Sequence, residues 1–322
     1  MRPERESPSS IRDVARTMMA DGVTAEVVRA LEPAGIPCIL LKGPALARWL
    51  YDEKDVRTYV DCDLMVAPEN ITGAENVLSE RGFRLSGFDS IEGDWPKHAR
   101  TWFREDSGNV DLHHTLVGVG VSDAELWELL SSRTERMHVL GAEVEVLTVA
   151  GRALVLALHA AKDGPRVEKV RRDLAKALER VPVNVWREAA ELAARLNASP
   201  GFAAGLRLLP EGRELARRLN LPSELRMEAA LRMSGGPPPL AAGLEWMANE
   251  PGLRRRVALA FRKMFPPRAY LRTWTPIARR GPLGLAVARA WRPFWVIWHL
   301  GPAFLAWRRA RRAVKRSGSE QG

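Results

Sequence analysis

The 322-residue sequence has little of what marks a secreted or membrane-spanning protein. Its only two cysteines, Cys38 and Cys62, lie in apolar surroundings, so we expect reduced core thiols and neither a disulfide framework nor a zinc site. The first residues, MRPERESPSSIRD, contain no apolar stretch typical of a signal peptide. No apolar segment reaches the roughly 20 residues that a membrane-spanning helix requires. These absences favour a cytoplasmic protein.

Acidic residues are almost missing from the C-terminal part of the chain. Residues 251–322 contain 17 of the 49 Lys and Arg residues but only one of the 39 acidic residues, Glu320. Their formal charge is therefore +16, and residues 1–250 carry −6. The excess of positive charge thus belongs to the tail, and it does not indicate that the whole protein binds nucleic acid.

The spacing of apolar residues predicts an α+β fold. Residues 9–34 have helical spacing, and short apolar runs in IPCILLKG, residues 59–66, ARTWFRED, GNVDLHHTL and EVEVLTV are typical of strands. After Ala150, Ala, Leu and Arg recur with a helical period. We expect four regions: a small mixed-sheet core with an N-terminal helix (1–149), a helical domain (150–233), a linker (234–239) and a basic, Trp-rich helical extension (240–322).

Two aspartates interrupt the apolar run in RTYVDCDLMV. Asp61 and Asp63 share one face of the predicted strand, while Cys62 and Leu64 face the core. Two carboxylates on one face repel each other unless a cation lies between them, and Mg²⁺ prefers such oxygen ligands. With Asp111 of VDLHH, they would suit two metal ions that support phosphoryl transfer. An Asp-x-Asp pair alone is weak evidence, because such pairs are common in turns and on solvated strand faces. With the Lys-Gly pair after an upstream strand and with Asp111, a metal site and a solvated face explain the pattern about equally well.

Further residues around these aspartates resemble a bacterial family of uncharacterised nucleotidyltransferases in the polymerase-β-like superfamily. The resemblance is carried by KGPALARWLYDEKDVRTYVDCDLMV, ERGF and VDLHH, and it continues in LALHAAKDG and RRDLAKAL. It covers residues 30–230, approximately. It implies a nucleotidyltransferase core followed by a helical domain on the acceptor side. It also implies transfer of a nucleoside monophosphate from an NTP to an acceptor hydroxyl, with release of pyrophosphate.

The resemblance assigns roles to six residues near the predicted strands. Asp61 and Asp63 would hold Mg²⁺, and Asp111 would complete a second metal site and accept the proton of the acceptor. Gly43 would let the backbone approach the phosphates of the NTP. Lys42 and Arg57 are candidates for neutralising the triphosphate. The Lys-Gly-Pro turn departs from the wider superfamily, because Pro44 has no N–H to offer a phosphate.

Four other polar residues are candidates for the acceptor pocket. His113 shares a strand face with Asp111, where it would position the acceptor or relay a proton, or would simply support Asp111 by a hydrogen bond. His159 and Lys162 lie three residues apart on one helix face. Asp173, on the next predicted helix, is a candidate partner of Lys162. As a bare pattern, these three residues are also typical of an ordinary polar helix face.

The basic extension allows three interpretations. In residues 286–316, Trp291, Trp295 and Trp298 have the spacing of one helix face, and several arginines follow them. The helix would dock on the catalytic core with its aromatic side chains buried, anchor the protein at a membrane surface, or bind nucleic acid or an acidic peptide. Packed aromatic residues are the commonest outcome for such a stripe.

The sequence therefore predicts a magnesium-dependent nucleotidyltransferase that uses an NTP, such as ATP, as co-substrate. The acceptor would be a small molecule, a peptide or a protein. RNA is a weaker candidate, because residues 1–250 carry a net negative charge. The alternative is a non-catalytic binding protein with a nucleotidyltransferase fold, associated with the membrane surface through 286–316. The presence of all three carboxylates argues against that alternative.

Overall fold

The computed structural model forms two compact units. It describes residues 11–52, 55–86, 98–105, 108–223, 227, 230–231 and 240–319. Within these residues, the first unit comprises 11–86, 98–156 and 172–198, and the second comprises 157–171 and everything from 199 onward. Residues 234–239, where the sequence predicts a linker, lie outside the described part of the chain.

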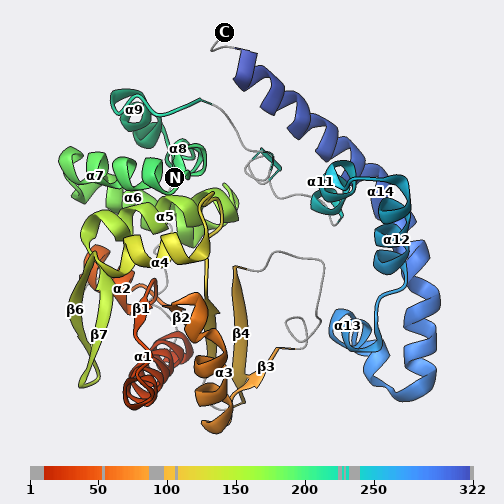
Figure 1. Cartoon of the computed structure of the whole chain (residues 1–322), viewed down its shortest axis with the longest axis horizontal. Helices are drawn as coiled ribbons and strands as arrows, with labels where there is room; N and C mark the ends of the chain where they lie inside the picture. Colours follow the sequence, from red (N-terminus) through yellow and green to blue (C-terminus); the bar gives the residue numbers. More distant parts are fainter. Residues whose placement is uncertain are drawn as a thin grey trace, which may run out of the picture. The chain divides into compact units, whose positions relative to one another are not determined.

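Seven strands among the described residues build one mixed sheet in the first unit (Figure 1). The order across the sheet is β3-β4-β5-β2-β1-β7-β6. β2 runs parallel to β5 and antiparallel to β1, and β1 runs parallel to β7. The strands are β1 (Cys38–Leu40), β2 (Asp61–Val66), β3 (Arg84–Leu85), β4 (Ala99–Arg104), β5 (Gly108–His113), β6 (Thr134–Val139) and β7 (Ala142–Leu147).

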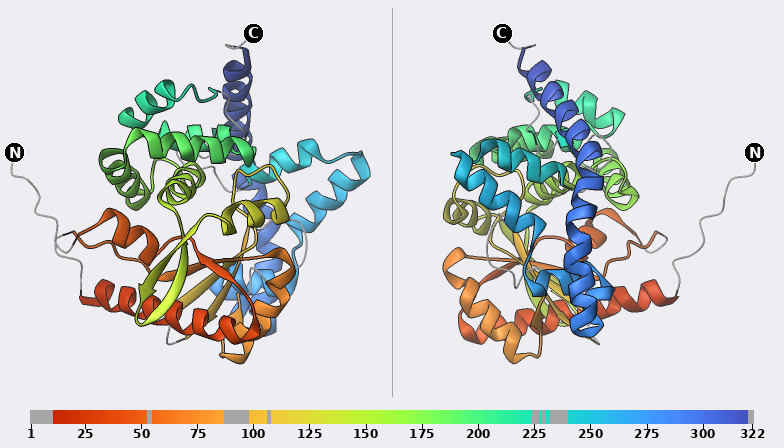
Figure 2. Two further views of the ribbon diagram at one scale, coloured as in Figure 1. Left: turned by 60° about the vertical axis from the view of Figure 1, so that its left-hand side comes forward. Right: turned by 90° about the vertical axis from the view of Figure 1, so that its right-hand side faces the viewer.

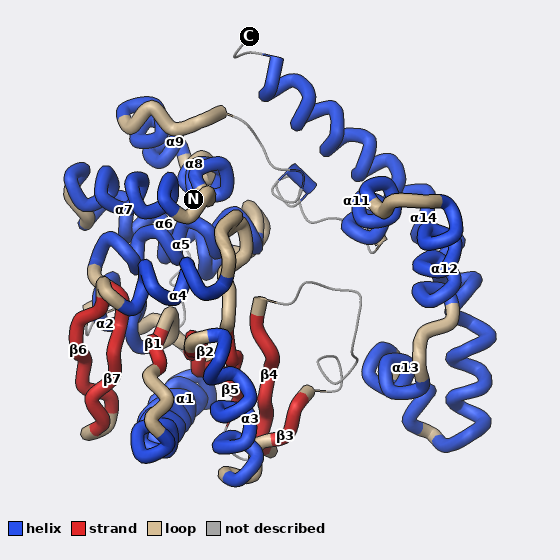
Figure 3. Tube along the Cα trace, viewed as in Figure 1, coloured by secondary structure: helices blue, strands red, loops and turns tan. Residues whose placement is uncertain are grey.

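Helices connect and cover these strands (Figure 3). The short 3₁₀ helix that follows the first α-helix ends at Gly35, whose φ of +67° suits glycine. A capping box between Ser122 and Glu125 starts α4. The helical elements that begin before residue 199 are α1 (Ile11–Leu31), η1 (Glu32–Ala34), α2 (Pro44–Leu50), η2 (Pro68–Asn70), α3 (Ile71–Glu80), α4 (Asp123–Ser131), α5 (Val149–Asp163), α6 (Glu168–Arg180) and α7 (Val183–Arg195).

The apolar core of the first unit lies between one face of the sheet and helices α1 and α3. Val27 and Leu31 of α1 pack in one cluster with Leu40 of β1 and with Cys62 and Leu64 of β2. Alternation along β2 therefore sends Asp61 and Asp63 to the opposite face, as the sequence predicts. Both cysteines are buried free thiols, and burial raises the pKa of Cys38 to about 12.

Most elements of the sheet follow the sequence prediction, so the α+β class with a mixed sheet is confirmed. Strands β1, β2, β4, β5 and β7 lie where apolar runs predict them. The sequence does not predict β3 or β6, and the residues TERMHV of β6 carry four exposed or half-exposed charged or polar side chains at one edge of the sheet. An edge strand with one solvated side lacks the apolar run that identifies the central strands.

The described part of the second unit is helical. Figure 2 shows α14 as a single long helix, although Pro293 and Pro302 lie inside it. Small side chains, Ala241 of α11 and Ala303 and Ala310 of α14, pack together. The elements from residue 199 onward are α8 (Ser199–Leu206), α9 (Pro210–Arg218), α11 (Ala241–Asn249), α12 (Leu253–Met264), α13 (Arg268–Trp274), η3 (Pro276–Arg279) and α14 (Gly281–Ser319).

A glycine on α8 tests the helix packing of the second unit. A Cβ atom added at Gly205 would lie 1.9 Å from the carbonyl oxygen of Ala157 on α5, whereas a Cβ at Gly22 on α1 would meet nothing within 4 Å. We expect Gly205→Ala to lower the free energy of unfolding by about 1–3 kcal/mol. Gly22→Ala should raise it by roughly 0.5–1 kcal/mol, because alanine favours the helix. Denaturant unfolding of both variants measures this, and equal effects would contradict the described packing.

Candidate functional site

Two carboxylates meet on the face of the sheet that is turned away from α1. The parallel register of β2 and β5 places Asp63 directly opposite Asp111. With His113, two residues further along β5, they form a group whose ligand atoms all lie within 4.8 Å of one another. Asp61 pairs in register with Asn109 and is not a member of this group. The structure thus brings together two of the three predicted metal-binding carboxylates.

His113 contacts Asp63 and not the carboxylate that it was expected to support. Its Nε2 lies 3.1 Å from Oδ1 of Asp63, and both side chains are buried. Among the described residues, His113 Nδ1 has no hydrogen-bond partner. The support of Asp111 comes from Thr101 on β4, whose hydroxyl donates to Oδ1 of Asp111 over 2.7 Å.

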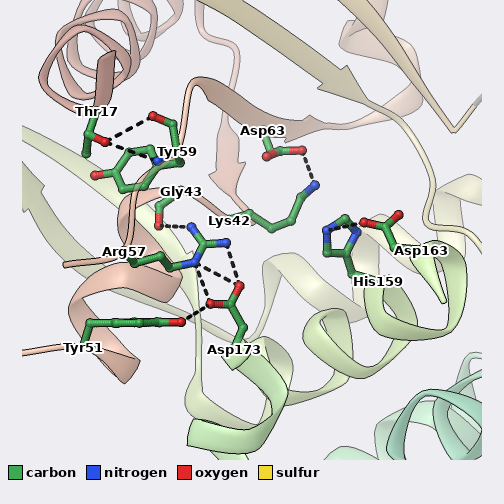
Figure 4. A network of polar contacts seen from close by, with 10 residues as sticks. All are labelled: Thr17, Lys42, Gly43, Tyr51, Arg57, Tyr59, Asp63, His159, Asp163 and Asp173. Atoms are coloured by element: carbon green, nitrogen blue, oxygen red, sulfur yellow. Dashed lines mark hydrogen bonds and ion pairs between the residues drawn. The ribbon is translucent and has the colours of Figure 1, made fainter. Parts of the chain in front are cut away.

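A lysine occupies the position of a cation beside these carboxylates. Lys42 follows β1, and its Nζ lies 2.6 Å from Oδ1 of Asp63 (Figure 4). The backbone N–H of Leu41 donates to the carbonyl oxygen of Asp63 over 2.9 Å, which fixes the turn beside β2. Gly43 then adopts a φ of +61°, a left-handed conformation that favours glycine, before Pro44 starts α2.

The three charged groups shift one another's protonation. Burial opposes the charge of Lys42, but the attraction of Asp63, with smaller contributions from Asp61 and Asp111, raises the pKa of the ammonium. Burial alone would raise the pKa of Asp63, yet Lys42 and His113 lower it well below its ordinary value. Burial and the charge of Asp63 raise the pKa of Asp111 in spite of the Thr101 hydrogen bond. A further cation at this position would favour the ionised form of Asp111.

Arg57 lies in a buried ion pair with Asp173 (Figure 4). Its Nε and Nη2 donate to the two carboxylate oxygens over 2.9–3.0 Å, and the Tyr51 hydroxyl donates to the same carboxylate over 2.6 Å. Its Nη1 lies 3.4 Å from the carbonyl oxygen of Gly43. The described partners of Asp173 are therefore Arg57 and Tyr51, where the sequence suggests Lys162.

The two other predicted pocket residues, His159 and Lys162, lie on the part of α5 that belongs to the second unit. His159 Nε2 is 3.3 Å from Oδ2 of Asp163, one helical turn further on. Both His159 and Lys162 are half-buried. Their place in an acceptor pocket stays a prediction.

Sequence reasoning missed Thr101 and Tyr51. Thr101 lies directly opposite Asp111 in the β4–β5 hairpin. The signal lies in the pairing of ARTWFRED with GNVDLHHTL, because the register of the two strands decides which residue of β4 faces Asp111. Tyr51 belongs to the WLYDE segment, which contributed to the family resemblance without a role for the tyrosine.

The family that the sequence resembles is also the one that matches. The model of a family described as uncharacterised nucleotidyltransferase matches residues 9–211, so the chain belongs to this family. The match covers α1, the whole sheet and the helices as far as the start of α9. No curated protein matches the chain in sequence.

Solved structures give weaker likenesses. They include the solution structure of the antibiotic-resistance factor ANT(2'')-Ia (14% identity, TM-score 0.40, 58% of this chain and 95% of that chain). The crystal structure of ANT(2'')-Ia with adenylyl-2''-tobramycin has 15% identity and a TM-score of 0.38, and the match covers 54% of this chain and 97% of that chain. An antigenic nucleotidyltransferase-like protein from Paracoccidioides brasiliensis has 14% identity and a TM-score of 0.35, and the match covers 60% of this chain and 95% of that chain. Likenesses at this level assign neither residues nor substrates.

The Arg57–Asp173 pair should be important for stability. Asp173→Asn leaves the arginine buried with a weaker partner, and we expect the free energy of unfolding to fall by about 3–5 kcal/mol. The matched control is Glu143→Gln on the β6–β7 hairpin, where Glu143 pairs with Arg136 and both side chains are more than half exposed. That loss should stay below about 1 kcal/mol. Denaturant unfolding compares the two, and similar losses would contradict a special role for the buried pair.

Proposed function

We propose that the protein is a Mg²⁺-dependent nucleotidyltransferase. It transfers a nucleoside monophosphate from an NTP to an acceptor hydroxyl and releases pyrophosphate. The observation that carries this proposal is the register of β2 and β5, which puts Asp63 opposite Asp111 with His113 beside them. The membership of the chain in a nucleotidyltransferase family supports it.

The residues present fit a divalent metal ion. Asp63 and Asp111 supply the carboxylate oxygens that Mg²⁺ prefers, and His113 adds a nitrogen ligand that also suits transition metals. A bound ion would neutralise the charge of the phosphates during transfer. Asp61 is half-buried on the same strand face, outside the group of three. We assign it to a second ion, as the family resemblance implies.

Asp111 is the candidate acceptor of the hydroxyl proton. It is less buried than Asp63, and Thr101 holds one of its oxygens. A cation bound beside Asp111 would favour its ionised form, which is the form that can accept a proton.

Lys42 and Gly43 would contact the phosphates of the NTP, while Arg57 would act indirectly, by positioning the turn that holds these two residues. Lys42 forms an ion pair with Asp63. A metal ion would compete for the same carboxylate oxygen and free the ammonium for a phosphate. Arg57 is committed to Asp173 and contacts the Gly43 carbonyl. We therefore propose that Arg57 positions the Gly43 turn, in place of the direct phosphate contact that the sequence suggests.

The acceptor is defined only by class. We propose a hydroxyl of a small molecule, a peptide or a protein, with His159 and Lys162 as candidate pocket residues. Asp173 is fully buried and paired with Arg57, which supports a structural role for it. The net negative charge of residues 1–250 argues against RNA as the acceptor.

One observation favours the second candidate function, a binding protein without activity. The Lys42 ammonium already supplies the positive charge that Asp63 needs. If no metal ion displaces it, the site would be inert. Metal binding therefore separates the two candidates.

Calorimetry of NTPs in the presence of Mg²⁺ tests the proposed function. We expect ATP or another NTP to bind only with Mg²⁺ or Mn²⁺, and Asp63→Asn and Asp111→Asn each to weaken binding at least about tenfold, because each removes a charged metal ligand. Glu143→Gln, the exposed control, should leave binding unchanged. Binding of no NTP with either metal would overturn the proposal. NTP binding without any release of pyrophosphate, even when water is offered as the acceptor of the nucleoside monophosphate, would favour the inactive candidate.

Removal of Lys42 should separate metal binding from nucleotide binding. Lys42→Met removes the competing cation, and the charged hydrogen bond that it breaks contributes about 1.5–3 kcal/mol. We therefore expect Mn²⁺ alone to bind roughly tenfold more tightly, and the NTP with Mn²⁺ to bind more weakly. Electron paramagnetic resonance counts free Mn²⁺, and calorimetry gives the NTP affinity. If the variant bound both Mn²⁺ alone and the NTP more weakly, Lys42 would have only a structural role.

A further inference from the structure

Large apolar side chains are exposed along one face of α14. Leu283 and Trp298 are 83% and 81% exposed, and the four other large apolar side chains of this face are more than half exposed. Their spacing of three, four or seven residues places them on one side of the helix. The stripe consists of Leu283, Val287, Trp291, Phe294, Trp298 and Leu305. A helix that packs only in a protein core would turn such a stripe inward.

The opposite side of α14 is the side that packs. Ala288, Ala303 and Ala310 are buried. Arg292 is buried too, and its guanidinium lies over the rings of Trp274 and Trp295, 4.5 and 4.4 Å from their centroids. These contacts fix the orientation of α14 within its own unit. Within this unit Trp295 thus packs against Trp274 and Arg292, whereas Trp291 and Trp298 are exposed. Docking of the helix on the catalytic core stays a prediction.

Positive charge continues the exposed face beyond the apolar stripe. Arg308, Arg309 and Arg312 follow Leu305 by three, four and seven residues, so they lie on the same side of α14, and all three are exposed. The face is thus apolar over most of the helix and basic toward its C-terminal end.

The neighbouring helix α12 repeats this combination. None of its residues is buried, and an isolated helix of 12 residues is marginal in water. Leu253, Val257 and Phe261 lie on one side at four-residue spacing, and all three are exposed. Arg255 and Arg262 lie toward the other side. A basic amphipathic helix with an unpaired apolar side is typical of helices that lie in a membrane surface.

We propose that α12 and α14 bind the surface of an anionic lipid bilayer. The apolar stripe would enter the headgroup region, and the arginines would contact lipid phosphates. Charge favours this partner over a second copy of the chain, since two tails of +16 each would repel. The charged backbone that nucleic acid exposes offers Leu283, Val287 and Leu305 far less apolar surface than a bilayer does. None of the helices in the described part of the chain is long and apolar enough to cross a bilayer, so the proposed binding is peripheral.

Vesicle flotation of the full-length protein tests this proposal. We expect the protein to float with vesicles of phosphatidylcholine and phosphatidylglycerol, and at least about tenfold less with phosphatidylcholine alone or at high salt. Trp291→Ala/Trp298→Ala should lower the partition coefficient at least about tenfold. Arg309→Gln/Arg312→Gln should lower it by about fivefold for each charge removed.

A matched control distinguishes binding through this face from non-specific hydrophobic binding to vesicles. Ile11→Ala/Met18→Ala removes two exposed apolar residues of α1 at the same seven-residue spacing as Trp291 and Trp298, and it should leave flotation unchanged. Circular dichroism and NTP binding check that the tryptophan variant is folded. No flotation of the wild type with the anionic vesicles would overturn the proposal. Unchanged flotation of the tryptophan variant would overturn it too. So would sedimentation equilibrium that finds the wild type as a dimer and only the tryptophan variant as a monomer.

Discussion

The parallel pairing of β2 with β5 is the constraint on which the candidate site depends. It places Asp63 opposite Asp111 and brings His113 within reach of Asp63. Like charges at this distance repel, and a counter-ion relieves that repulsion. Lys42 supplies that counter-ion from the turn after β1. The strand pairing and the charge of Lys42 therefore depend on each other, and a metal ion bound here would take the place of the Lys42 ammonium.

A second, buried ion pair contacts the same turn. Arg57 donates to Asp173 and contacts the carbonyl of Gly43, the residue after Lys42. A buried pair of this kind adds less to stability than it costs when one partner is lost, but it fixes geometry. Here the geometry is that of the Lys42–Gly43 turn. The proposed nucleotide contacts thus depend on Asp173, far along the chain on α6.

The sequence predicted the strands better than it predicted the partners of the charged side chains. Alternation in DCDLMV requires Asp61 and Asp63 to face away from Cys62 and Leu64, and the structure has this arrangement. The partners of Asp173 and Asp111 depend on where α6 and β4 pack, which local periodicity does not contain. The exposure of Trp291 and Trp298 was missed for a related reason. Helical spacing defines a face, but it does not say which face packs.

The sheet order also determines when the site can form during synthesis. Ile39 of β1 pairs with Glu145 of β7, and Arg57 pairs with Asp173. Contacts this distant in sequence form late, because a long loop must close first. A ribosome that has produced only the first hundred or so residues has released Lys42, Arg57 and Asp63 but neither Asp111 nor Asp173. The nascent chain must therefore keep these charged groups in water until the strands and helix that enclose them have been made.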